Sequence, residues 1–512
     1  MQIAWSPFPM ETQHFDVLII GAGLSGIGAA FHLQEKCPGK SYAILEGRGA
    51  IGGTWDLFRY PGIRSDSDMY TLGYIFKPWK ERKAIADGPA ILNYVRETAE
   101  ENGIDQNIRF NHLVKQTSWD SGRAMWTVEA EDTASGETHT FTCGFLYSCA
   151  GYYSYEGGHR PEFAGEEAFA GQIVHPQQWP EDLDYKDKKV VVIGSGATAV
   201  TLVPEMAKTA AHVTMLQRSP TYVVSRPAED AMANRLRRWL PSKWAYGLTR
   251  WRNILFQSFF FNLARKRPER VKKRLLDEAQ KALGPDIDVS RHFNPDYNPW
   301  DQRLCLIPDG DLFHALKEKS ASVVTDHIEK FTETGIDLKS GEHLDADIIV
   351  TATGLKLVFL GGVEIEVDGQ RIDPASLHGY RGVMFEGLPN LVSTFGYTNA
   401  SWTLKADLTA DFVTRLLKYM DQKDFSDVRP LPDEPLEDLP WLDFSSGYVT
   451  RAYDALPKQG EKMPWRLHQN YLKDISALRH ADFEDGVLRF RKAGEPHAAD
   501  QNESHPAVVA AE

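Results

Sequence analysis

The sequence predicts an α/β fold with two Rossmann-like dinucleotide-binding domains and a helical insertion. Two observations predict the domains. A buried apolar strand runs into a glycine-rich turn and a helix at residues 15–35, and the same order returns at residues 188–207. A third observation predicts the insertion, because residues 221–297 are amphipathic and aromatic, with a dense basic run and no such turn.

Composition limits the classes of protein to which this chain can belong. Its 512 residues, 42% hydrophobic and 25% charged, suit a globular protein of two or three domains. A net charge of −14 argues against a nucleic-acid surface, which needs Lys and Arg to neutralise phosphates. No apolar run reaches the roughly 18 residues of a membrane span, and the first residues lack the regions of a signal peptide. We therefore expect a soluble, cytoplasmic protein.

Cysteine usage agrees with a reducing compartment. Four cysteines in a chain of this length do not make a disulfide framework, and no CxxC or Cys/His cluster predicts a metal site. We expect free thiols and no metal ligands. The four are Cys37, Cys143, Cys149 and Cys305.

The first glycine turn, GAGLSG, follows the strand FDVLII and opens a helix. Glycines allow the tight turn and the close approach of a pyrophosphate, while the helix N-terminus supplies amide donors. The next strand, SYAILEG, ends in Glu46, whose carboxylate can accept hydrogen bonds from a ribose diol. The unit therefore predicts FAD or NAD. Its candidate binding residues are Gly21, Gly23, Ser25, Gly26 and Glu46.

The second turn, GSGATA, begins at Gly194 and differs at the end of its second strand. The strand HVTMLQR ends in Arg218 and Ser219, with no carboxylate. A guanidinium fits a 2′-phosphate through paired charge-assisted hydrogen bonds, so this site predicts NADPH. A solvated surface arginine is the alternative. The candidate binding residues of this second nucleotide site are Ser195, Gly196, Ala197, Thr198, Ala199, Val200, Thr201, Arg218 and Ser219.

The two units divide the chain into discontinuous domains. We assign residues 1–150 and 360–493 to an FAD-binding domain, and residues 151–220 and 298–359 to an NADP-binding domain. Residues 221–297 form the helical insertion, and residues 494–512 a loose tail without periodicity. A chain with one FAD-type and one NADP-type site most simply carries hydride from nicotinamide to flavin.

Two further stretches carry a resemblance to a known family. Phe169-x-Gly171-x3-His175-x3-Trp179-Pro180 stands between the two units, and GGTWDLFRYPGIRSD spans residues 52–66. Together with the glycine turns, they resemble class B flavin monooxygenases of the Baeyer-Villiger type. The runs RYPGIRSDSDMYTLG, NPWDQRLCLIP and GYTNASWTLKADL most resemble the branch that contains the ethionamide-activating monooxygenase.

The resemblance implies the activity and the cofactors. The enzyme would use FAD, NADPH and O2 to insert one oxygen atom next to a carbonyl, forming an ester or lactone through a C4a-peroxyflavin. It would also oxidise thioether or thioamide sulfur. The expected partners are O2 and a small lipophilic ketone or sulfur-containing substrate, while the physiological substrate and the oligomeric state stay open.

The same resemblance implies roles for single residues. Arg303 would be the catalytic cation, since arginine keeps its charge, and Asp66 would orient it. His175 would couple domain motion without touching substrate. Further residues would line the flavin, meet the adenine through the backbone of Val114, or bind cofactor elsewhere: Thr54, Trp55, Asp56, Arg64, Ser65 and Val114.

Three alternatives remain open at this point. One is a monooxygenase that oxidises nitrogen or sulfur without Baeyer-Villiger activity. In such enzymes the motif related to residues 169–180 usually lacks the final Trp-Pro. A disulfide reductase would need Cys143 and Cys149 as a redox pair beside the flavin. A redox sensor without turnover would not need Arg303.

A basic run, ARKRPERVKKR, follows the apolar stretch ILFQSFFF. It holds seven Lys or Arg and one Glu between Arg265 and Arg274. We interpret it as a solvated helix face, and contact with an anionic membrane surface is the alternative.

Overall fold

The first predicted unit is the centre of a large sheet in the computed structural model, which describes residues 12–302 and 304–495. It consists of β1 (Gln13–Ile20), α1 (Leu24–Lys36) and β2 (Tyr42–Leu45). β1 pairs in parallel with β2 on one side and with β6 (Thr138–Ser148) on the other. Its last four residues are all buried, which explains their unbroken apolar run.

Nine strands make up this first sheet, in the order β18, β17, β4, β5, β6, β1, β2 and β3, with β21 paired to β6. Residues far apart in sequence therefore share it, because β17, β18 and β21 return to it after the chain has left at β6. The strands not yet given are β3 (Ile108–Arg109), β4 (His112–Asp120), β5 (Met125–Asp132), β17 (Glu364–Val367), β18 (Gln370–Ile372) and β21 (Leu391–Ser393).

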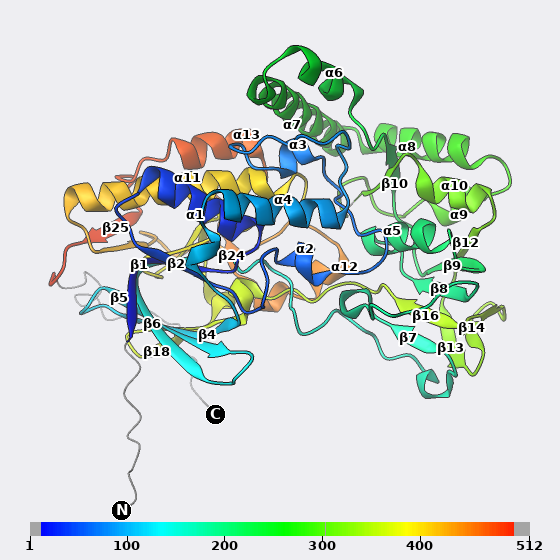
Figure 1. Cartoon of the computed structure of the whole chain (residues 1–512), viewed down its shortest axis with the longest axis horizontal. Helices are drawn as coiled ribbons and strands as arrows, with labels where there is room; N and C mark the ends of the chain where they lie inside the picture. Colours follow the sequence, from blue (N-terminus) through cyan, green and yellow to red (C-terminus); the bar gives the residue numbers. More distant parts are fainter. Residues whose placement is uncertain (1–11, 303, 496–512) are drawn as a thin grey trace, which may run out of the picture.

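Five parallel strands form a second sheet, in the order β12, β9, β8, β16 and β7. Figure 1 shows the two sheets at opposite ends of the molecule. The presence of two Rossmann-like units confirms the predicted fold class, while the exact domain boundaries stay a proposal. The elements of the second unit are β8 (Lys189–Ile193), α5 (Ala197–Met206), β9 (His212–Gln217), β12 (Ala321–Thr325), β16 (Ile348–Thr351) and β7 (Gln172–Val174).

The insertion contains four helices: α6 (Ala231–Trp239), α7 (Ser242–Lys266), α8 (Pro268–Leu283) and α9 (Val289–His292). In Figure 1, α6 and α7 project from the upper edge of the molecule. A strand also lies in the range predicted to be helical, because β10 (Val223–Arg226) pairs in parallel with β11 (Cys305–Pro308). The β-branched pair Val223 and Val224 is buried there and favours the extended backbone.

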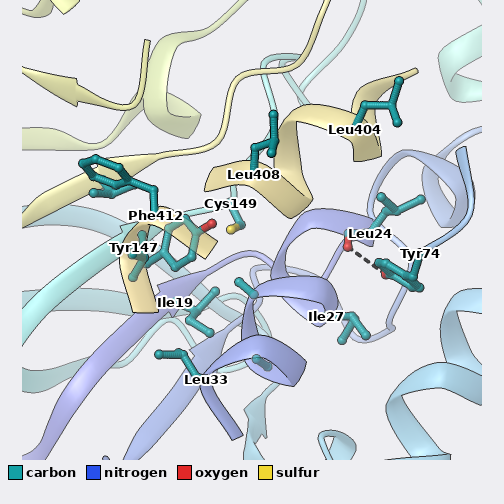
Figure 2. Packing of buried hydrophobic residues seen from close by; sticks show 14 of the residues in the cluster. Ile19, Leu24, Ile27, Leu33, Tyr74, Tyr147, Cys149, Leu404, Leu408 and Phe412 are labelled. Carbon is teal, nitrogen blue, oxygen red and sulfur yellow. Dashed lines mark hydrogen bonds between the residues drawn. The ribbon is translucent and has the colours of Figure 1, made fainter. Parts of the chain in front are cut away.

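The largest core lies between α1 and the long helix α11 (Trp402–Lys423). Figure 2 shows its apolar side chains, among them Leu33 of α1 and Leu408 and Phe412 of α11. The Tyr74 hydroxyl donates to the carbonyl of Leu24 at 2.7 Å, which satisfies a polar group inside this core. Close packing of two helices on the sheet fixes the start of α1, where the first glycine turn lies.

The remaining helices are short or peripheral. Among the described residues, none combines the length and the apolar run that crossing a bilayer requires. They are α2 (Thr54–Leu57), α3 (Met69–Leu72), α4 (Gly88–Glu101), α10 (Asp311–Lys317), α12 (Gly447–Thr450) and α13 (Tyr471–Asp474). The remaining strands are β13 (Ile328–Thr332), β14 (Gly335–Leu338), β15 (His343–Asp345), β19 (Gly379–Tyr380), β20 (Met384–Phe385), β22 (Asp427–Pro430), β23 (Leu439–Pro440), β24 (Lys458–Gln459) and β25 (Leu488–Arg491).

Candidate active site

Both glycine turns open into one cavity of about 1320 Å³. Its walls come from both sheets and from the connector between them, so the two predicted nucleotide sites are continuous. The predicted site residues that line it are Gly21, Gly23, Ser25, Glu46, Thr54, Trp55, Arg64, Ser65, Asp66, Val114, Ser195, Gly196, Ala197, Thr198, Thr201, Arg218 and Ser219. Four others lie behind this lining: Gly26, Asp56, Ala199 and Val200.

The first turn is packed too tightly for a side chain at Gly26, and Gly53 lies close against Gly23. A Cβ on Gly26 would lie 1.9 Å from the carbonyl oxygen of Gly21, and one on Gly53 would lie 3.1 Å from the Cα of Gly23. Gly21 and Gly23 line the cavity without side chains, so a pyrophosphate can approach the backbone at the N-terminus of α1. The Ser25 hydroxyl accepts a hydrogen bond from the Trp402 indole at 2.7 Å, which leaves its own proton to donate.

Glu46 is held in place beside this turn. Its carboxylate accepts hydrogen bonds from the backbone amides of Ala22 at 2.7 Å and Arg48 at 2.9 Å. Burial raises the pKa of the Glu46 carboxyl, while these two amides and the Arg48 charge oppose that rise. A carboxylate fixed in this way at the cavity wall fits a ribose diol, so the residues present suit the expected FAD.

Asp56 does not line the cavity. Its carboxylate, 2% exposed, pairs with Arg48 at 2.5 Å, Arg59 at 2.7 Å and Arg96 at 2.9 Å. These contacts tie α2 to α4 and to the segment after β2. The side chain is thus committed to three arginines, and a direct part for Asp56 in cofactor binding stays a prediction.

The second turn presents hydroxyl and cationic groups. Ser195 donates its hydroxyl proton to the carbonyl of Ser219 at 3.0 Å, which joins the turn to the end of β9. Arg218 is exposed at the cavity wall, next to Ser219. A Cβ on Gly196 would have nothing within 4 Å, so the space in front of the N-terminus of α5 is free for a phosphate.

Arg451 is a second cation at this end of the cavity, and the sequence reasoning missed it. Burial lowers the pKa of its guanidinium, and the nearby positive charge of Arg218 lowers it further. Two neighbouring guanidinium groups form a strongly anion-attracting wall. Because Arg451 lies in another part of the chain, no local pattern connects it with Arg218.

The turn that carries Asp66 also reaches the cavity. Asp66 accepts a hydrogen bond from the Ser67 hydroxyl at 3.5 Å, and Ser65 accepts one from the Ser67 amide at 2.9 Å. Arg64 pairs with Asp311 at 2.5 Å, so its charge is balanced. Arg303 lies outside the described residues.

Aromatic rings form a part of the cavity wall that the sequence did not assign. Tyr152 stacks on Trp402 with 4.9 Å between ring centroids and 13° between planes. The Tyr152 and Tyr153 hydroxyls are 2.8 Å apart. Flat apolar walls with few polar groups are typical of sites for planar cofactors and small apolar substrates.

His175, the histidine of the motif at residues 169–180, lies on the connector between β6 and β8, outside the cavity lining. His175 follows β7 and its Nδ1 accepts the amide proton of Gln177 at 3.2 Å, while the Gln177 side chain donates to the carbonyl of Ser154 at 2.6 Å. Burial lowers the pKa of the His175 ring. The motif at residues 169–180 thus joins the second sheet to residues 152–156, which line the cavity.

Cys143 and Cys149, the redox pair that a disulfide reductase would need, lie in separate hydrophobic cores. Cys143 packs with Leu18 and Trp126, whereas Cys149 packs with Ile19 and Tyr147. Burial raises the pKa of both thiols to about 12, so both stay protonated at neutral pH. A dithiol that exchanges electrons with flavin needs an accessible thiolate, which this arrangement does not supply.

Three potential metal ligands do gather, although the sequence predicted no such cluster. The ligand atoms of His112, Asp132 and His139 lie within 4.8 Å of one another, on β4, β5 and β6. The residues are spread over three strands, so their spacing along the chain carries no metal motif.

Comparison with known sequences gives close relatives over almost the whole chain. A flavin-binding monooxygenase-like family model matches residues 84–251, and an NAD(P)-binding Rossmann-like domain matches residues 19–78. The FAD-containing monooxygenase EthA of Mycobacterium tuberculosis is 55% identical over 487 residues, which cover 95% of this chain and 99% of that protein. The probable FAD-binding monooxygenase AlmA of Acinetobacter baylyi is 51% identical over 94% of this chain and 97% of that protein.

Solved structures share the fold at lower identity. An oxidized steroid monooxygenase bound to NADP superposes with a TM-score of 0.73 at 22% identity, covering 94% of this chain and all of that one. An open cyclohexanone monooxygenase gives a TM-score of 0.73 at 18% identity with the same coverage. At these identities the likeness is one of fold.

Proposed function

Because the chain belongs to the EthA-type FAD-containing monooxygenases, we propose that it inserts one oxygen atom of O2 next to a carbonyl, turning a ketone into an ester or lactone. NADPH supplies the two electrons, and the second oxygen atom leaves as water. We include oxidation of thioether or thioamide sulfur by the same oxygen-transfer route. The chain is a flavin monooxygenase that uses FAD and NADP, and the Baeyer-Villiger step is the proposal.

The observation that supports this proposal most strongly is the single cavity shared by two unlike nucleotide sites. Glu46 at one end suits a free ribose diol, whereas Arg218 and Arg451 at the other suit a phosphate. Hydride transfer requires the two redox rings to lie next to each other, and a continuous cavity permits that.

Residues of this chain would control the reaction around the cofactors. Bound FAD would supply the oxygen-activating chemistry. Arg303 would hold a permanent positive charge against the oxyanion that forms at the substrate carbonyl, and Asp66 would orient it. The aromatic wall of Tyr152 and Trp402 would exclude water from the reacting atoms.

A product assay under isotopically labelled O2 tests the proposal. The purified holoenzyme is supplied with NADPH and a panel of ketones, thioethers and amines, and products are identified by mass spectrometry. We expect labelled esters or lactones from ketones and labelled sulfoxides from thioethers. Sulfoxides or N-oxides without any ester would support the alternative without Baeyer-Villiger activity. Release of thiols from a disulfide substrate at the expense of NADPH would favour the reductase instead.

A further inference from the structure

Large apolar side chains gather on the outer side of the helical insertion. Of the thirteen exposed large apolar side chains among the described residues, eight belong to α6 and α7. Trp239 is 82% exposed, Trp244 69% and Phe259 65%. The surfaces of soluble proteins normally expose large apolar side chains singly, not in groups. The eight are Met232, Trp239, Trp244, Leu248, Trp251, Leu255, Phe256 and Phe259.

Five of these residues form one stripe along α7. Their spacing of four, three, four and four positions keeps them on one face of the helix. We call this set the α7 stripe. It consists of Trp244, Leu248, Trp251, Leu255 and Phe259.

The opposite face of α7 is fixed to the body of the protein. Arg250, buried to 3% exposure, donates to the carbonyls of Tyr70 at 2.8 Å and Gly73 at 2.7 Å and pairs with Asp407 at 3.1 Å. The side-chain amides of Asn253 and Gln257 donate to Asp68, at 2.9 and 3.0 Å, one turn apart. These polar anchors leave the helix no rotation that would bury the α7 stripe.

The segment that carries the stripe is strongly basic. Residues 231–274 contain 13 Lys or Arg and one acidic residue, Glu269, so their net charge is +12 in a chain whose total is −14. Lys266, Arg270 and Lys273 are exposed near the C-terminal end of the stripe. Positive charge is thus concentrated where the exposed aromatic side chains lie.

We propose that the α7 stripe and the surrounding basic residues dock the enzyme on an anionic lipid bilayer, with α7 lying in the plane of the interface. Tryptophan and phenylalanine enter the boundary between headgroups and acyl chains, and Lys and Arg are attracted to anionic headgroups. A second copy of the chain would bring the same exposed cations, among them Lys266, Arg270 and Lys273, against this surface, which disfavours self-association through it. The proposal is independent of the reaction proposed above.

Vesicle sedimentation of the FAD-loaded enzyme tests the docking. We expect binding to phosphatidylcholine vesicles that contain phosphatidylglycerol, weaker binding at high salt, and little binding to phosphatidylcholine alone. Two double variants, Trp244→Ser with Phe259→Ser and Lys266→Glu with Lys273→Glu, should each weaken binding about tenfold or more. Flavin content and NADPH oxidation in the absence of lipid should stay unchanged, which shows that the variants are folded.

A matched charge-reversal control separates docking from net charge. Lys330→Glu with Arg371→Glu changes two exposed cations on β13 and β18, on the opposite side of the molecule from α7 in Figure 1. We expect this variant to bind vesicles as the unmodified enzyme does. An equal loss in the control would overturn the proposal, as would the absence of binding to anionic vesicles. If the stripe variants instead lower the mass of the lipid-free protein in light scattering and bind vesicles normally, the stripe is a subunit interface.

Discussion

Arg218 is the residue on which cofactor choice should depend most. Removing its guanidinium by Arg218→Ala takes away charge-assisted hydrogen bonds to a 2′-phosphate, each of which contributes about 1.5–3 kcal/mol. We expect kcat/KM for NADPH to fall about 10- to 100-fold, while the value for NADH, which lacks that phosphate, changes little. Arg451→Ala should act in the same direction. Steady-state kinetics with both nucleotides measure the ratio.

Lys189→Ala is the control for this pair, because Lys189 lies on the same sheet but pairs with Asp345 at the surface. It should leave the preference for NADPH as it is. Equal losses for NADPH and NADH in Arg218→Ala would mean that this arginine does not read the 2′-phosphate.

Replacing Arg303 should separate flavin reduction from oxygen transfer. Reduction of the flavin needs only the geometry for hydride transfer, whereas oxygen transfer needs a fixed positive charge at the developing oxyanion. Arg303→Ala should keep NADPH-dependent flavin bleaching, lose product formation about 100- to 1000-fold, and release hydrogen peroxide in place of product. Stopped-flow absorbance and a peroxide assay follow both on one sample. Unchanged product yield would remove Arg303 from the mechanism.

At the scale of elements, Asp56 connects α2, α4 and the segment after β2. Asp56→Ala leaves Arg48, Arg59 and Arg96 without their shared buried partner, so we expect a lower melting temperature together with loss of FAD on dilution. Thermal unfolding and flavin release are measured on the same preparation. If Asp56→Asn loses FAD while its melting temperature stays that of the unmodified enzyme, Asp56 binds the cofactor directly.

The packing of α11 on α1 gives a second test at this scale. Leu408 is fully buried in the core of Figure 2, and Leu408→Ala should destabilise the fold by about 2–5 kcal/mol and lower the melting temperature. Lys418→Ala changes an exposed residue of the same helix and should have little effect. A similar shift in both variants would argue against tight packing at Leu408.

Features that a local sequence pattern defines could be predicted from the sequence. Features that depend on contacts between residues far apart in the chain could not. Each glycine turn lies in the same βαβ unit as its own strand end, Glu46 in the first unit and Arg218 in the second, so a local pattern was enough to find them. The strand β10 gains its partner β11 only across the whole insertion, and Arg451 approaches Arg218 only after the chain has formed another domain. For such contacts the tertiary structure decides, and no local period reports it.

At the scale of the whole molecule, the segment that carries His175 links the two sheets. Burial lowers the pKa of this ring, so it is neutral at neutral pH and its Nδ1 can accept the Gln177 amide proton. The stabilisation that this contact contributes is therefore complete above the ordinary histidine pKa of about 6.5 and is lost as the pH falls through the lower folded value.

His175→Asn should consequently flatten one part of the pH dependence of stability. Asparagine can accept a hydrogen bond but does not titrate, so the difference in melting temperature between enzyme and variant should be constant above about pH 6.5 and should move in the variant's favour below it. Taking the difference removes the titration of the other histidines, which both proteins share. If the variant also slows flavin reduction while the KM for NADPH and the FAD content stay the same, His175 acts by positioning the two domains. A difference in melting temperature that does not vary from about pH 5 to 8 would show that protonation of His175 does not disturb this connection.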